Sequence, residues 1–158
     1  MKIKAFLSHR YGSRCLPARI VENEYEMLKT ELEKSEKITA DDLKFHHKID
    51  EENVYNFENI FLDCYQLDRN EIPARFKLKP LNVILKNFDS KDAKFKDLHL
   101  VWARIEEKLG NLLRTAADGC LEKGLMSPNR HERYFISVTQ KEIVDGILNA
   151  NNIENNVL

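Results

Sequence analysis

Apolar residues recur at helical spacing near the start of the chain. Pro17 precedes this stretch and favours an extended approach to it. Charged residues, mostly glutamates, fill the positions between the apolar ones, and the early glutamates suit the positive end of a helix dipole. The pattern therefore predicts an amphipathic helix from about Ile20 to Ser35, whose apolar face consists of Val21, Tyr25, Leu28 and Leu32.

The longest periodic series lies in the second half of the chain. Its members keep to one helical face: Leu98, Val101, Trp102, Ile105, Leu109, Leu112, Leu113 and Ala116. We expect a long core helix with Trp102 packed in the interior. The helix can continue to Lys123, with Gly119 as a tolerated weak point and Gly124 as the residue that follows its end.

A third series with helical spacing lies between these two. Its members are Val54, Phe57, Ile60, Phe61, Cys64 and Leu67. They predict a helix of about four turns, which ends at the turn residues Asp68 and Asn70 and the following Pro73. The charged stretch 36–53 predicts a second short helix or an ordered loop, and the segment Phe76 to Leu81 is expected to be extended.

Shorter sequence patterns that predict secondary structure lie near the beginning and the end of the chain. The alternation in Lys2 to Ser8 predicts a short strand, followed by a turn in which Gly12 releases the backbone. Residues 130–133 are expected to be a polar connector, and residues 134–138 a short strand or an extended lead-in.

A capping box follows this lead-in. The Thr139 hydroxyl can accept a hydrogen bond from the Glu142 amide, while the Glu142 side chain accepts one from the Thr139 amide. A final helix is therefore expected to run to residue 148, and the asparagine-rich tail 149–158 is expected to fray.

Helical segments outnumber strands in this pattern, which predicts an α-rich α/β fold with one or two short strands. The sequence shows no repeat or linker, so we expect one domain over residues 1–148. One or two strands cannot form a stable sheet alone. The chain is therefore expected to be the later part of a larger α/β domain.

The composition argues against three classes of protein: nucleic-acid binders, membrane or secreted proteins, and disulfide-linked proteins. The 25 basic and 26 acidic residues leave a net charge of −1, which does not favour nucleic-acid binding. No apolar run approaches the roughly 18 residues of a membrane span, and the N-terminus does not resemble a secretory signal. The three cysteines form no close pair, which is typical of reduced thiols in the cytoplasm.

Residues with catalytic or ligand-binding chemistry are scattered along the sequence. Gly119 and Gly124 have the spacing of a phosphate-binding loop, but Leu125 and the next methionine replace its lysine and hydroxyl residue. The adjacent histidines at 46 and 47 point in different directions on any regular element, and the segment 68–71 lacks the glycine of a calcium loop. The sequence therefore predicts no catalytic residue, no cofactor and no metal site.

Three stretches together resemble a known protein family. They are Arg10 to Pro17, Tyr65 to Leu78, and Tyr134 to Leu148. In order and spacing they resemble the region that precedes the NTPase module in NACHT and WD repeat domain-containing proteins. The motif residues are Arg10, Tyr11, Gly12, Pro17, Asp68, Asn70, Pro73, Thr139 and Glu142. Read physically, the two prolines fix extended segments, and Asp68 and Asn70 can close a turn with their side chains.

The sequence departs from the family at several positions. Cys64 stands where the family often has tryptophan, Ala74 replaces a second proline, and Phe76 replaces a tyrosine. The family's first strand and helix would lie before Met1, and its NACHT module would lie after Leu158. The resemblance therefore implies a fragment or truncated product of a TIR-like or flavodoxin-like domain, without the residues that bind nucleotide.

The resemblance implies a function without chemistry. We expect a non-enzymatic, cytoplasmic regulatory or protein-interaction domain of a NACHT/WD-repeat signalling NTPase, whose partner is the adjoining NACHT module or another protein. Two alternatives stay open. One is a TIR-like domain with a nucleotide or NAD-processing pocket, and the other is a free-standing helical adaptor that binds through the 54–67 or the 98–116 stripe.

Overall fold

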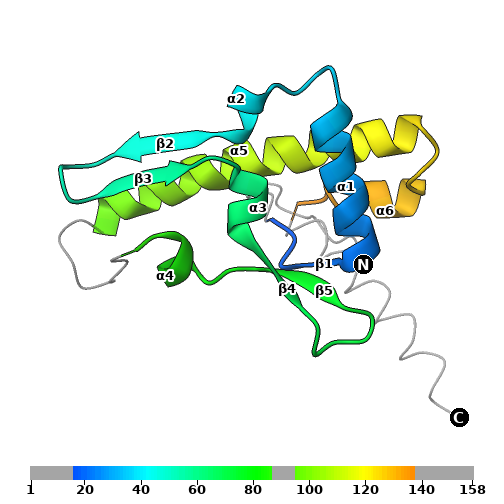
Figure 1. Ribbon diagram of the computed structural model, residues 1–158, viewed down its shortest axis with the longest axis horizontal. Coiled ribbons are helices and arrows are strands. Elements are labelled where there is room, and N and C mark those ends of the chain that lie inside the picture. The colour runs from blue at the N-terminus through cyan, green and yellow to red at the C-terminus, as the bar shows by residue number, and fades with distance from the viewer. Residues whose placement is uncertain (1–15, 87–94, 138–158) are drawn as a thin grey trace, which may run out of the picture. The chain divides into compact units, whose positions relative to one another are not determined.

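The computed structural model describes residues 16–86 and 95–137 (Figure 1). The chain divides into two units, and the fold described here is that of the unit Leu16–Tyr134. Several expectations lie outside the described residues: the strand at residues 2–8, Arg10, Tyr11, Gly12, the Thr139–Glu142 capping box, the final helix and the tail.

The described residues of this unit form eleven helices and strands. In chain order they are β1 (Arg19–Val21), α1 (Glu22–Lys34), α2 (Ala40–Leu43), β2 (Phe45–Lys48), β3 (Val54–Phe57), α3 (Ile60–Cys64), β4 (Tyr65–Asp68), β5 (Arg75–Leu78), α4 (Leu81–Ile84), α5 (Phe95–Glu122) and α6 (Pro128–Glu132). The coarse α/β expectation is confirmed. The expectation of one or two strands is wrong, because the described residues alone contain five.

The two main helices form where the apolar spacing predicts them. α1 begins at Glu22 because β1 takes up the residues before it, and α1 buries Tyr25, Leu28 and Leu32. α5 ends one residue before the predicted Lys123. Gly124 then adopts a φ of +70°, the left-handed conformation that glycine accepts at no steric cost.

The core lies where α1 crosses the C-terminal half of α5 (Figure 1). The α5 stripe faces this core, and these members of it are fully buried: Val101, Ile105, Leu109, Leu113 and Ala116. Trp102 lies at the margin of the stripe and is only half-buried. The expectation of an interior Trp102 is therefore confirmed only in part, because the edge of a helical stripe faces partly toward solvent.

β1, β5 and β4 form a three-stranded antiparallel sheet in that order. Ile20, Phe76 and Leu67 pair across the three strands and share one face. On this face the Phe76 ring stacks on Tyr25 of α1 at 3.6 Å between centroids, and Tyr25 in turn stacks on Phe61 of α3 at 4.5 Å. Tyr65 of β4 also contacts both the Tyr25 and the Phe61 ring, so an aromatic cluster joins the sheet to α1 and α3.

The helix predicted over residues 54–67 is wrong. This stretch forms β3, α3 and β4, and β3 pairs with β2 from Val54 opposite Lys48 to Phe57 opposite Phe45. Valine and aromatic side chains favour strands, and the Asn59 side chain accepts hydrogen bonds from two backbone amides to begin α3 anew. The apolar spacing was accurate for the burial of Ile60, Phe61 and Cys64, all within α3, whereas Val54 at the start of β3 is 45% exposed.

The expectations for three shorter stretches are confirmed in part. The 36–53 stretch contains α2, which has a capping box between Thr39 and Asp42, and the strand β2. The extended segment at Phe76 is confirmed as β5. The connector expected at 130–133 is wrong in part, because Pro128 occupies the first turn of α6, and residues 134–137 form no strand. The described strand pairs are all antiparallel.

We predict that the two large α5 side chains contribute unequally to stability. Leu109→Ala should lower the free energy of unfolding by about 2–5 kcal/mol, because Leu109 is 0% exposed and its removal leaves a cavity. Trp102→Ala should cost clearly less, since the half-buried indole leaves no closed cavity. Urea denaturation measures both values, and an equal or larger loss for Trp102→Ala would contradict the described packing.

Candidate functional site

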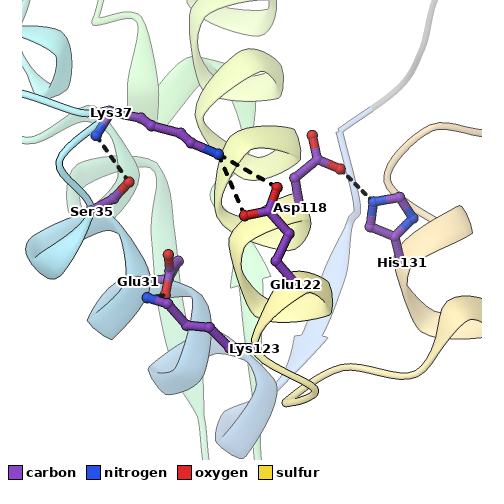
Figure 2. Close-up of polar contacts among 7 residues, drawn as sticks. All are labelled: Glu31, Ser35, Lys37, Asp118, Glu122, Lys123 and His131. Atoms are coloured by element: carbon purple, nitrogen blue, oxygen red, sulfur yellow. Dashed lines mark hydrogen bonds and ion pairs between the residues drawn. The ribbon is translucent and has the colours of Figure 1, made fainter.

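Buried and exposed charges gather where the C-terminal end of α5 meets α1 and α6. We call this set the helix-junction cluster: Glu24, Glu31, Lys37, Asp118, Glu122, Lys123, Arg130, His131 and Tyr134. Figure 2 shows three of its pairs, which join Lys123 to Glu31, Lys37 to Glu122, and His131 to Asp118. The cluster thus links α1, α5 and α6 through side chains from all three helices.

Two acids of α1 form the interior of this cluster. Glu24 and Glu31 are seven residues apart, two helical turns, and therefore lie on one face with Leu28. Only 6% of Glu24 and 7% of Glu31 are exposed. A buried carboxylate is costly unless charged or hydrogen-bonding groups surround it, so the partners of these two acids are essential to the fold.

Each buried acid has its own partners. The Lys123 Nζ lies 2.6 Å from Glu31 Oε2. The Tyr134 hydroxyl donates to Glu24 Oε1 at 2.6 Å, and Arg130 lies 3.8 Å from Glu24 Oε2. Burial and the hydrogen bond to Glu24 both raise the pKa of Tyr134, which therefore stays a donor at ordinary pH. Glu31 joins α1 to the end of α5, whereas Glu24 joins α1 to α6 and Tyr134.

Gly119 makes room for the Glu31 carboxylate. A Cβ at this position would overlap Glu31 Oε1, although the backbone of Gly119 is ordinary α-helix. The sequence indicates Gly119 only as a weak point of the helix. The structure explains why glycine occupies this position, because a side chain here would displace the buried Glu31 from Lys123.

The two described cysteines lie in the core rather than at the surface. Burial raises the pKa of the Cys64 thiol to about 12 and that of the Cys120 thiol to about 11. The Cys120 thiol also contacts the Met27 carbonyl oxygen of α1 at 3.9 Å. Both groups stay protonated at neutral pH, so neither has the reactivity of an activated nucleophile. Cys64, a member of the apolar series at 54–67, is 0% exposed.

The resembled motif residues in the described part build the β4–β5 hairpin. The Asp68 Oδ1 accepts a hydrogen bond from the Asn70 amide at 2.9 Å, so the turn expected at these residues is confirmed. Pro73 follows a cis peptide bond directly before β5, and the Pro17 carbonyl accepts from the Tyr65 hydroxyl at 2.9 Å. These residues shape and fasten the hairpin.

A network of ion pairs braces the outer face of this hairpin. Glu71 contacts Arg19 at 3.3 Å, Arg75 at 3.2 Å and Lys77 at 2.8 Å. Lys77 also lies 2.6 Å from Asp68. The hydrogen bond from Lys77 is the main cause that lowers the pKa of both carboxyl groups. The network therefore ties the loop before β5 to all three strands of the sheet.

Two hollows open on the described surface. One of about 760 Å³ lies beside β4 and β5, where Asp68 and Lys77 pair with each other. The other, of about 370 Å³, lies between α2 and α5 and includes Asp42 and Lys108. Within residues 16–86 and 95–137, no three or more His, Cys, Asp or Glu side chains are grouped to hold a metal ion.

The sequence analysis considered a pair of histidines and missed two buried acids. Neighbouring His46 and His47 lie on β2, and the His47 Nδ1 is 3.0 Å from Arg104 of α5. Sequence reasoning missed the buried Glu24 and Glu31, which it placed on the solvent side of α1. Their seven-residue spacing, in line with Leu28, was the available signal, but it gives no information about which helix covers them.

Comparison with known proteins gives no relative for this chain. No family model matches it, and no match was found among curated proteins or among solved structures. Among the described helices, none combines the length and the apolar character that a membrane crossing requires.

We predict opposite effects for alanine at two glycines of α5. Gly119→Ala should lower the free energy of unfolding by about 1–3 kcal/mol, because its methyl group overlaps the Glu31 carboxylate. Gly110→Ala is the matched control. Its Cβ meets only the end of the flexible Arg114 side chain at 3.2 Å, so helix propensity should give a gain of up to about 1 kcal/mol. Urea denaturation compares them, and a stabilising Gly119→Ala would refute the contact.

We also predict that Cys64 and Cys120 resist alkylation in the folded chain. Their raised pKa values and burial keep the thiolate fraction small, so iodoacetamide at pH 8 should modify both only after denaturant is added. Peptide mass spectrometry follows each cysteine separately. Modification of either one in the native chain at the rate of the unfolded chain would contradict the described core.

Proposed function

We propose that this chain is a non-enzymatic regulatory or protein-interaction domain of a NACHT/WD-repeat type signalling NTPase. The proposal rests on the resemblance of three sequence stretches to the region before the NTPase module, and on the shape that one of them takes. In this proposal the antiparallel sheet is a peripheral part of a larger TIR-like or flavodoxin-like domain, whose central strands would be parallel.

The observation that carries the proposal is the β4–β5 hairpin, which projects from the unit (Figure 1). Ile72 lies in its connecting loop and is 99% exposed. Single exposed apolar residues are common on protein surfaces. Ile72 differs from most of them because it lies in a loop that ion pairs hold in place and within a stretch that carries the resemblance.

The bracing of this loop favours a contact role. Because Glu71 contacts three cations from β1 and β5, these ion pairs restrict the loop that carries the residue next to it. Such a preformed loop then loses little conformational entropy when a partner binds it. An aliphatic side chain surrounded by charged groups also matches the usual pattern of a buried anchor within a polar rim.

Another proposed role, an adaptor that binds through the 98–116 stripe, has less support. The side chains of that stripe are buried in the core except for the half-buried Trp102, so the stripe offers little apolar surface to a partner. The hairpin is therefore the better candidate for contact with the adjoining module.

Two experiments test the proposal. The gene sequence beyond residue 158 should encode a phosphate-binding loop followed by WD repeats. The purified chain, incubated with ATP or NAD, should show no turnover. A gene without an NTPase module, or turnover that increases with the amount of purified chain, would each overturn the proposal.

We predict that Ile72→Asp weakens binding of this chain to the NTPase module of the same gene by about tenfold or more, because an anchor residue loses its apolar contact. Leu100→Asp is the matched control, since Leu100 is a 62% exposed aliphatic residue on α5. Both variants should keep the wild-type denaturation midpoint. Isothermal titration measures the affinities, and equal affinity of the Ile72→Asp variant would contradict a role for the hairpin.

A further inference from the structure

The segment Ser127–Tyr134, which we call the α6 strap, is attached to the unit in an unusual way. It contains the five-residue helix α6, which has no buried residue. A helix of this length is not stable by itself in water. The strap therefore keeps its shape through contacts with α1 and α5, chiefly those of its side chains.

The backbone hydrogen bonds of the strap stay within it. The amides of Arg130 and His131 donate to the Ser127 carbonyl, and those of Arg133 and Tyr134 donate to carbonyls at residues 130 and 131. The described backbone bonds thus do not tie the strap to α1 or to the body of α5. It can separate from both helices without breaking a ladder of backbone bonds.

Side chains hold the strap both to α5 and to α1. His131 contacts Asp118 of α5 at 2.6 Å, and in this pair the Asp118 side chain is exposed while that of His131 is only 19% exposed. Tyr134 is buried, and its hydroxyl donates to the buried Glu24 at 2.6 Å. Since Arg130 also faces Glu24 at 3.8 Å, this one acid of α1 binds the strap at two of its residues.

The buried carboxylate of Glu24, in turn, depends on the strap for its hydrogen-bond donors. With Tyr134 and Arg130 removed, its carboxylate would lack a donor in an apolar setting, unless the strap opens and water enters. Attachment of the strap and the hydrogen bond to Glu24 are therefore coupled events. Tyr134 is, in addition, the last residue of this unit, so the chain leaves the unit at this attachment point.

We propose that the α6 strap opens and closes as a unit, with Glu24 as the latch that holds it to α1. Closing the latch fixes the point from which the chain continues, and opening it frees that point. This device follows from the described contacts. Its use as a relay to an adjoining NTPase module rests on the proposed function.

Hydrogen exchange of the full 158-residue chain, followed by mass spectrometry, tests the latch. Glu24→Gln and Tyr134→Phe should each raise the exchange of amides 130–134 by about tenfold or more, because the first leaves only a weaker neutral acceptor and the second removes the donor. Glu31→Gln is the matched control. It changes the other buried acid of the same α1 face, whose partner Lys123 lies outside the strap, so strap exchange should stay at the wild-type rate.

The slow amides of α5 between residues 105 and 116 give the reference for global opening. They should keep their wild-type rates in Glu24→Gln and Tyr134→Phe. The latch is overturned if strap amides are unprotected in the wild type, if neither variant accelerates them, or if strap and α5 amides accelerate by the same factor. A gene that encodes no NTPase module would refute the proposed function and leave this measurement unaffected.

Discussion

The fold of the described unit depends on the position of one aromatic ring. Tyr25 of α1 lies between Phe76 of the sheet and Phe61 of α3, and its hydroxyl donates to the Phe61 carbonyl at 3.3 Å. Aromatic stacking and area burial therefore join a helix, a strand and a second helix at one point. The buried acids Glu24 and Glu31 lie on the same broad face of α1 as Tyr25, so the placement of this ring also affects how the acids meet their partners on α5 and beyond.

Sequence reasoning succeeded where one element supplies the whole pattern. α1 and α5 keep their apolar spacing over several turns, and Gly124 marks the end of α5 by its backbone conformation. It failed at residues 54–67, because the apolar positions of two strands and a short helix together imitate one helical face. The observation that distinguishes one long helix from two strands and a short helix is the pairing of β3 with β2, which is not local in sequence.

The polar interior could not be predicted for a different reason. The burial of Glu31 depends on Gly119 and Lys123, which lie far along the chain and become its neighbours only when α1 packs on α5. The hairpin was more accessible to prediction, since Asp68 and Asn70 close their turn locally. Its bracing by Arg19 was not, because that residue comes from β1.

The two shielded thiols have a consequence for following the motions of this unit. Cys64 lies at the junction of α3 with the sheet, whereas Cys120 lies against the Met27 carbonyl in the contact between α1 and α5. A fluctuation that parts the sheet from α3 exposes the first sulfur, and one that parts the two long helices exposes the second. The chain thus carries two native reporters that distinguish which half of its interior has loosened, without any label being introduced.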